Sequence, residues 1–268
     1  MTATLSPLAE LLLSVLGGAA LLLVVGAATL VGPARLRACR GSLRGRLRET
    51  WPYLVLLGGV LLVNTVARDY GPEISWAIGW NVTGLIYAVE REFVALVQSV
   101  ATPALTALFS TVYLVGYVFL LVFPFVAYLA LDDQRLLKAT SLAYAVNYAV
   151  GVCCYVLFVS YGPRNLLPGQ VESLLYVTYP RTQILTGAVN VNTNVFPSLH
   201  TSLSVTVAAL AWRSRDHYPG WCVVALPLAA AVAVATMYLG IHWALDVLAG
   251  LLLGLGSAAL GLAVADRE

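Results

Sequence analysis

Two histidines and one aspartate in the last third of the chain, His200, His242 and Asp246, have the clearest capacity for chemistry. His242 and Asp246 are four residues apart, so on a helix they would share one face and the carboxylate could reach a ring nitrogen. Such a contact fixes the tautomer and raises the basicity of an imidazole. An aspartate inside an apolar helix is costly unless it has a partner, which makes it a functional candidate. A structural pair that joins two helices would have the same spacing.

Two other polar stretches are suited to binding an anion. In residues 161–165, Arg164 follows a turn-forming Gly-Pro pair and can present a planar set of donors to phosphate oxygens. In residues 196–201, a proline beside Ser198 indicates the start of a helix, where free N–H groups and the helix dipole favour an anion that His200 would face. Taken singly, Arg164 and His200 also fit ordinary polar residues at a membrane boundary.

The elements that must position these residues are membrane helices. Of the 268 residues, 60% are hydrophobic and 10% are charged, whereas about a quarter of the residues in a soluble domain are charged. About 20 apolar residues are needed to cross a hydrocarbon layer of about 30 Å. We therefore predict an all-α, polytopic membrane helix bundle of about seven transmembrane helices, which forms a single integral-membrane domain over residues 1–268. The predicted spans are 11–31, 50–67, 106–131, 139–161, 197–212, 221–238 and 242–265.

The uncharged stretch 93–131 is too long for one span, and Pro103 divides it. Its first part follows a cluster of aromatic and acidic residues, so we expect an amphipathic helix that lies at the membrane interface. We expect the catalytic core, which carries the motifs, within about 103–265.

The basic residues of the loops between the predicted spans, six of which lie in the loop that follows the first span, predict the orientation of the bundle. With the N-terminus outside, the inner side receives 11 of the 15 Lys and Arg residues and the outer side receives four, as the positive-inside rule requires. This arrangement brings the three polar stretches together on the outer face. We therefore predict an integral protein of the cell membrane with an extracytoplasmic active site, the N-terminus outside and the C-terminus in the cytoplasm.

Composition also argues against several classes of partner. A net charge of +2 is too small to suggest binding to nucleic acid. The four cysteines lack the paired spacing of a disulfide framework or a zinc cluster, so we expect them to be packing residues. The oligomeric state is not indicated by the sequence.

Together, the three polar stretches resemble motifs of the type 2 phosphatidic acid phosphatase superfamily of membrane phosphoesterases, over about residues 161–250. Pro-Ser-Leu-His at 197–200, in place of Pro-Ser-Gly-His, and Tyr-Gly-Pro-Arg at 161–164 are more similar to the inositol phosphorylceramide synthase branch and its prokaryotic relatives. The phosphatase pattern has lysine, proline, serine and arginine at four positions where this sequence has, in that order, Leu157, Asn165, Ala235 and Thr236. These departures argue against a simple phosphomonoesterase.

The resemblance implies a role for each candidate residue. His242 would attack phosphorus, Asp246 would orient it, and His200 would protonate the leaving oxygen and later activate the acceptor. Arg164 and Ser198 would hold the phosphoryl oxygens, with help from helix N-terminal N–H groups. The resemblance implies a lipid phosphate or phosphodiester from the bilayer as substrate, and an alcohol or a lipid as acceptor. The scheme needs no metal and no other cofactor.

Two other classes of function fit the same residues. A seven-span, metal-dependent membrane hydrolase could use His200, His242 and Asp246 as zinc ligands with an open water position. A non-enzymatic lipid transporter could use these polar residues as a gate. Sensitivity to a chelator separates the first class from a metal-free phosphotransferase, and absence of activity in the purified protein would favour the second.

Overall fold

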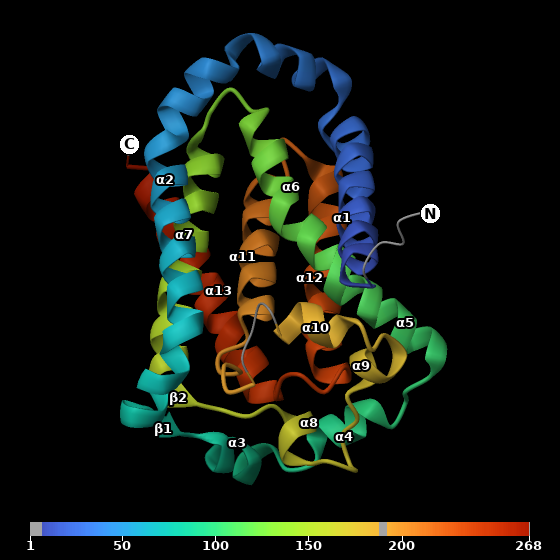
Figure 1. Cartoon of the computed structure of the whole chain (residues 1–268). Helices are drawn as coiled ribbons and strands as arrows, with labels where there is room; N and C mark the ends of the chain where they lie inside the picture. Colours follow the sequence, from blue (N-terminus) through green and yellow to red (C-terminus); the bar gives the residue numbers. More distant parts are fainter. Residues whose placement is uncertain (1–6, 188–191, 268) are drawn as a thin grey trace, which may run out of the picture.

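In the part of the chain that the structure describes, six helical segments are long and apolar enough to cross a membrane, judged by length and composition. The computed structural model describes residues 7–187 and 192–267, and these are almost entirely helical (Figure 1). The prediction of a polytopic, all-helical membrane bundle is therefore confirmed. The six segments are α1 with η1 (Pro7–Gly26, Ala27–Val31), α2 (Pro33–Ile78), α5 with η2 and α6 (Pro103–Thr111, Val112–Gly116, Tyr117–Leu129), α7 (Arg135–Leu157), α12 (Pro219–Tyr238) and α13 (Ala244–Ala265).

The fifth predicted span is a shorter helix than the others. It is α11 (Leu199–Arg213), which has 15 residues and so measures about 22 Å. α11 lies inside the bundle, where it packs against α12, α13, α7 and α6 (Figure 1). Because other helices surround it, α11 does not need the length of a lipid-facing span. Six helices of full length and this inner helix account for the predicted number of about seven.

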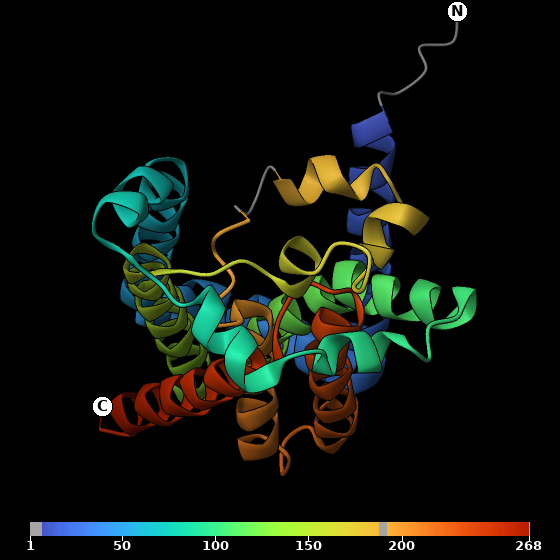
Figure 2. The same cartoon turned by 90° about the horizontal axis from the view of Figure 1, so that it is seen from below.

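Short elements close one end of the bundle, as the view from below shows (Figure 2). The predicted interfacial helix is two short helices, α3 (Thr83–Glu90) and α4 (Phe93–Gln98), because Arg91 has a positive φ of 50° and breaks the helix between them. The predicted break at Pro103 is the start of α5, capped by the Thr102 side chain. The other short elements are β1 (Trp80–Asn81), β2 (Phe158–Val159), α8 (Pro163–Leu166), α9 (Leu174–Thr178) and α10 (Thr182–Gly187), and β1 pairs with β2 in parallel.

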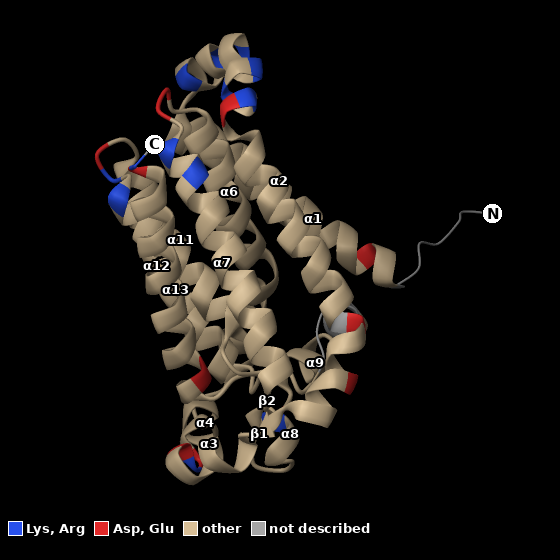
Figure 3. Ribbon diagram, turned by 90° about the vertical axis from the view of Figure 1, so that its left-hand side faces the viewer, with Lys and Arg blue, Asp and Glu red and all other residues tan. Residues whose placement is uncertain are grey.

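The basic stretch after the first span, which we expected as a loop, is the beginning of α2. α2 is 46 residues long, and its first part arches over the end of the bundle opposite the short elements (Figure 1). Most Lys and Arg residues gather at this end (Figure 3). Arg46 anchors the arch, since its guanidinium donates to the backbone oxygens of Leu129 and Leu131 and pairs with Asp132. The separation of charge between the two ends is as predicted.

A seam of glycines on α13 sets how closely this helix approaches its neighbours. A Cβ at Gly250 would lie 2.4 Å from the Ser198 backbone oxygen, and one at Gly254 would lie 2.3 Å from the Ser202 oxygen. The backbones of α13 and α11 are therefore in direct contact, as in other membrane helix pairs that meet at small residues. The contact matters for chemistry because α11 begins next to His200 and α13 begins next to His242.

Candidate active site

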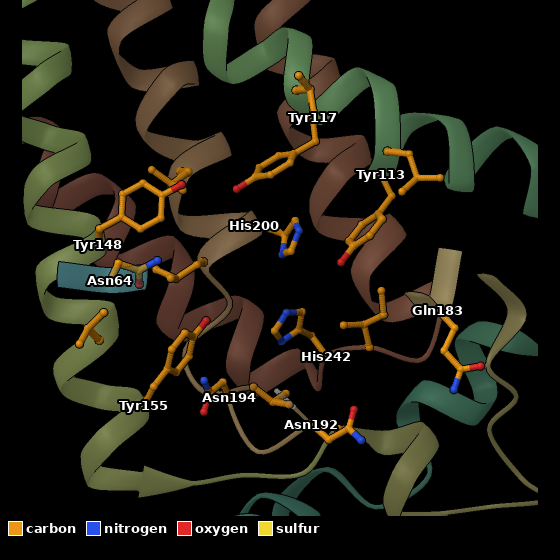
Figure 4. A pocket seen from close by; sticks show the side chains of 18 of the residues that line it. Asn64, Tyr113, Tyr117, Tyr148, Tyr155, Gln183, Asn192, Asn194, His200 and His242 are labelled. Atoms are coloured by element: carbon orange, nitrogen blue, oxygen red, sulfur yellow. The ribbon is translucent and has the colours of Figure 1, made fainter. Parts of the chain in front are cut away.

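A cavity of about 910 Å³ lies between α1 and α2 and reaches the first turn of α11. His200 and His242 face one another in it, and tyrosines from α7 and from the η2–α6 segment surround them (Figure 4). Their ring centroids are 6.2 Å apart. The structure thus brings together two histidines that are 42 positions apart in the chain, with a space between the rings that suits a small tetrahedral group.

His242 and Asp246 meet, but not on one helical face as we expected. Gly240 has a positive φ of 71° and Trp243 is extended, so α13 begins only at Ala244 and His242 lies in the preceding turn. The Asp246 side chain folds back and accepts a hydrogen bond of 2.8 Å from the Trp243 backbone N–H. Its Oδ2 is 3.5 Å from Nδ1 of His242, and both side chains are buried. The predicted contact is therefore present, with a turn in place of a helix.

Burial sets the protonation state of His242. Desolvation lowers the pKa of His242 to about 3, and the positive charge of Arg164 lowers it further, while a backbone hydrogen bond with Val195 opposes the shift. The ring is consequently neutral at physiological pH. A neutral imidazole has a free lone pair, which a nucleophile needs.

His200 is held between two aromatic rings. The centroids of Tyr113 and Tyr117 are each 4.6 Å from the centroid of His200. Packing from both sides restricts the orientation of the imidazole and keeps it directed at His242 (Figure 4). Neither tyrosine was singled out from the sequence, because tyrosines are common in these spans and their spacing does not show which of them converge.

Arg164 is fixed at the wall of the cavity next to His242. One terminal nitrogen, Nη2, donates to the Tyr176 hydroxyl at 2.9 Å, and the guanidinium lies 4.4 Å above the Tyr176 ring. The other terminal nitrogen, Nη1, is buried without a hydrogen-bond partner in the described part of the chain. An unsatisfied, fixed cationic donor is suited to an oxyanion.

The loop that carries Arg164 is attached directly to the loop that carries His242. The Arg164 N–H donates to the Gly240 oxygen at 3.2 Å, and Trp243 Nε1 donates to the Tyr161 oxygen at 2.8 Å. A Cβ at Gly162 would lie 2.4 Å from the Ile241 oxygen, so only glycine permits this approach. The first and third polar stretches of the sequence therefore form one unit.

The hydroxyl of Ser198, which we predicted to hold a phosphoryl oxygen, has partners within the protein. Ser198 is fully buried and caps the start of α11. Its hydroxyl accepts hydrogen bonds from the N–H and the hydroxyl of Thr201. Ser198 is not among the described residues that line the cavity. Its N–H donates to the Asp246 backbone oxygen at 3.0 Å. Ser198 thus connects the second polar stretch to the third, through the backbone.

The start of α13 already has a negative partner. Glu90 of α3 accepts hydrogen bonds from the N–H groups of Ala244 and Leu245, at 2.7 and 3.0 Å. Burial raises the pKa of Glu90, and the two backbone hydrogen bonds counteract part of this effect. No pattern of spacing indicated this contact, because it joins residues 154 and 155 positions apart. A substrate anion would therefore rely on Arg164 and α11.

A metal site would need at least three ligating side chains close together. Among residues 7–187 and 192–267, no group of three or more His, Cys, Asp or Glu side chains lies close enough to hold a metal ion. The four cysteines are free thiols.

Comparison with known proteins gives one family and one fold match. The family model described as the PAP2 superfamily matches residues 85–260. The crystal structure of Aquifex aeolicus LpxE superposes with a TM-score of 0.50 at 22% sequence identity, covering 65% of this chain and 94% of that one, which shows a shared fold. No curated protein matches the chain. Neither match is to the inositol phosphorylceramide synthase branch, so the assignment of the chain to that branch stays a prediction.

Proposed function

The chain belongs to the PAP2 superfamily, and from this membership, which implies a phosphatase or phosphotransferase, we propose a membrane enzyme that cleaves a lipid phosphate or phosphodiester through a phosphohistidine at His242. The single observation that carries this proposal is the arrangement of His242, His200 and Arg164 around one cavity, with Asp246 behind His242. A nucleophile, an acid–base partner, an oxyanion donor and an orienting carboxylate are thereby within reach of one phosphorus atom.

In the first step, Nε2 of His242 attacks phosphorus while the bond from phosphorus to the leaving oxygen breaks. The leaving oxygen takes a proton from the His200 imidazolium, a form that the negative charge of the bound phosphate stabilises. The phosphorylated ring of His242 keeps its proton on Nδ1 and becomes positively charged, and Asp246 Oδ2 stabilises it at 3.5 Å. Arg164 Nη1 donates to a non-bridging phosphoryl oxygen throughout.

In the second step, an acceptor hydroxyl, from water or from an alcohol, attacks phosphorus. His200, now neutral, takes the acceptor's proton, and the bond from phosphorus to Nε2 breaks to return His242 to its neutral form. Proton and charge balance over the two steps. The same geometry serves hydrolysis and transfer, so the group that occupies the acceptor position decides the product.

We further propose that transfer between alcohols is favoured over hydrolysis of a monoester. Arg164 is the one Lys, Arg, Asp or Glu residue among the described residues that line the cavity. A phosphate monoester carries nearly two negative charges, whereas a phosphodiester carries one and needs fewer cationic partners. Thr236, which stands where the family pattern has a cation, uses its backbone oxygen to accept from the His242 N–H at 3.1 Å.

The shape of the cavity suits a substrate with hydrocarbon chains. Leu12, Val15 and Leu16 of α1 form an apolar wall on one side of the cavity. α1 packs on α6 and η2, whereas α2 packs on α7, so the two N-terminal helices flank the cavity (Figure 1). A lipid chain lying between them would remain in an apolar environment while its phosphate reaches the histidines.

The experiment that tests the proposal follows both products. Purified protein in detergent is given ³²P-labelled phosphatidate and a labelled phosphodiester lipid, with and without added alcohols, and free phosphate and labelled lipid products are measured. We expect label in an acceptor lipid, inhibition by vanadate and unchanged rates in EDTA. Loss of activity in EDTA, restored by zinc, would favour the metal-dependent hydrolase. If free phosphate from the monoester appears fastest under every condition and no acceptor becomes labelled, transfer is excluded.

We propose that the site faces the outside of the cell, because the basic residues gather at the opposite end (Figure 3). In a background without the four native cysteines, a cysteine at the exposed Gln170, near the site, should react with a membrane-impermeant thiol reagent in intact cells. A cysteine at Ser42, in the arch of α2, should react only after the cells are opened. The reverse pattern would place the site in the cytoplasm.

A further inference from the structure

The cavity has a second polar region, deeper in the bundle than His242 (Figure 4). Asn64 of α2, Tyr117 of α6 and Tyr148 of α7 line it, and each belongs to a segment that can span the membrane. Tyr117 and Tyr148 direct their hydroxyls toward one another on the side of His200 that faces away from His242 (Figure 4). We call Asn64, Tyr117 and Tyr148 the deep polar cluster.

The polar atoms of the deep polar cluster are unsatisfied within the protein. No hydrogen bond joins the Asn64 amide, the Tyr117 hydroxyl or the Tyr148 hydroxyl to another group in residues 7–187 and 192–267, and these polar atoms are not fully buried but open to the cavity. By contrast, Tyr144, one turn from Tyr148, donates to the Leu121 oxygen at 2.9 Å. Polar groups inside a membrane protein are costly unless they are paired. Three such groups that face one space indicate a ligand with which they pair.

The chemistry of the deep polar cluster identifies the class of ligand. A phenol hydroxyl and a carboxamide can each donate and accept a hydrogen bond, and neither is charged. Arg164, the one Lys, Arg, Asp or Glu residue of the described lining, lies near His242. The deep end therefore suits an uncharged group that both donates and accepts, and an alcohol is such a group.

We propose that Asn64, Tyr117 and Tyr148 form a subsite for a hydroxyl-bearing leaving or accepting group. The proposal rests on the proposed function: the oxygen that His200 protonates or deprotonates must lie beside His200, so the group attached to that oxygen extends toward the deep polar cluster. Asn64 lies outside residues 85–260, the part that matches the family model. The subsite is therefore formed in part by α2, which lies outside the region that matches the family model.

The test compares two lipids that differ in a hydroxyl group. Hexadecyl phosphate has none, whereas 1-palmitoyl-glycerol 3-phosphate has a free hydroxyl next to the phosphate ester, on a hydrophobic chain of similar length. In the Tyr117→Phe/Tyr148→Phe variant, which keeps both rings, we expect kcat/KM for the hydroxyl-bearing lipid to fall about tenfold, the effect of one or two neutral hydrogen bonds. For hexadecyl phosphate we expect a change of less than about twofold, since its leaving group makes no such bonds.

A second variant and a control keep the outcome clear. Asn64→Leu should also lower the ratio of kcat/KM for the hydroxyl-bearing lipid to kcat/KM for hexadecyl phosphate. Tyr144→Phe removes a hydroxyl that is bonded elsewhere, so it should leave this ratio unchanged. Equal losses on both lipids, or no loss on either, would overturn the subsite and leave these residues in contact with water only. Such a result would leave the proposed function intact, because the turnover of hexadecyl phosphate depends on His242 and not on the subsite.

Discussion

Replacing His242 with alanine is expected to lower kcat on lipid phosphates by on the order of 10³-fold or more, because the variant has no atom that can form the bond to phosphorus. The ring is neutral and buried, with Asp246 at 3.5 Å, so the variant loses both the attacking lone pair and the group that Asp246 orients. Labelling with ³²P-substrate followed by an alkaline quench, under which a phosphohistidine survives, should yield a labelled protein in the wild type and none in His242→Ala.

His217 provides a matched control, because it is the third histidine of the chain, is exposed and lies at the opposite end of the bundle. His217→Ala should retain activity within about twofold, as expected for a surface substitution. Asp246→Asn should be impaired as well, since an amide cannot stabilise a positively charged ring. Full activity of a folded His242→Ala variant would refute the assignment of the nucleophile.

Removing the guanidinium of Arg164 is expected to lower kcat by about 10²- to 10³-fold, the usual effect of losing an oxyanion donor. Nη1 of Arg164 is buried without a partner in the described part of the chain, so its positive charge is available to the substrate. Arg164→Lys should recover only part of the loss, because an ammonium cannot stack on Tyr176, donate to its hydroxyl and reach the phosphate at once.

Arg181→Ala serves as the control for this substitution. Arg181 is exposed and pairs with Glu10 at 2.7 Å, and an exposed ion pair contributes little to stability. Steady-state kinetics with one phosphodiester lipid would compare the variants, with thermal unfolding as the measure of folding. If Arg164→Ala keeps at least half of the wild-type kcat while Arg181→Ala behaves in the same way, Arg164 has no part in stabilising the phosphoryl group.

The spans and the charge asymmetry could be predicted because both depend on properties that each residue carries with it. Hydropathy over about 20 residues does not depend on packing, and six of the predicted spans correspond to helices of full length. The basic arch was predicted as a loop because charge was read as the end of a span. A helix at the membrane surface can carry charge along its whole length, and the basic stretch is accordingly the first part of α2.

The site was predictable where chemistry is local and was missed where it depends on packing. The spacing of His242 and Asp246 gave their contact, although the turn at Gly240 replaced the expected helix. The contacts of Tyr176 with Arg164 and of Glu90 with the start of α13 depend on how distant loops fold over one another. No spacing in a single sequence reveals such contacts.

The glycine seam of α13 determines where the protein tolerates mutation. Gly250 and Gly254 allow backbone contact with α11, so any larger side chain there must push the two helices apart and separate the histidines that they position. Leu252 and Leu255 of the same helix are exposed toward lipid and can be replaced by other apolar residues. In a library of random variants, inactive clones should therefore map as a periodic line along α13, recurring at every helical turn, and most of its members will lie far from any reacting atom.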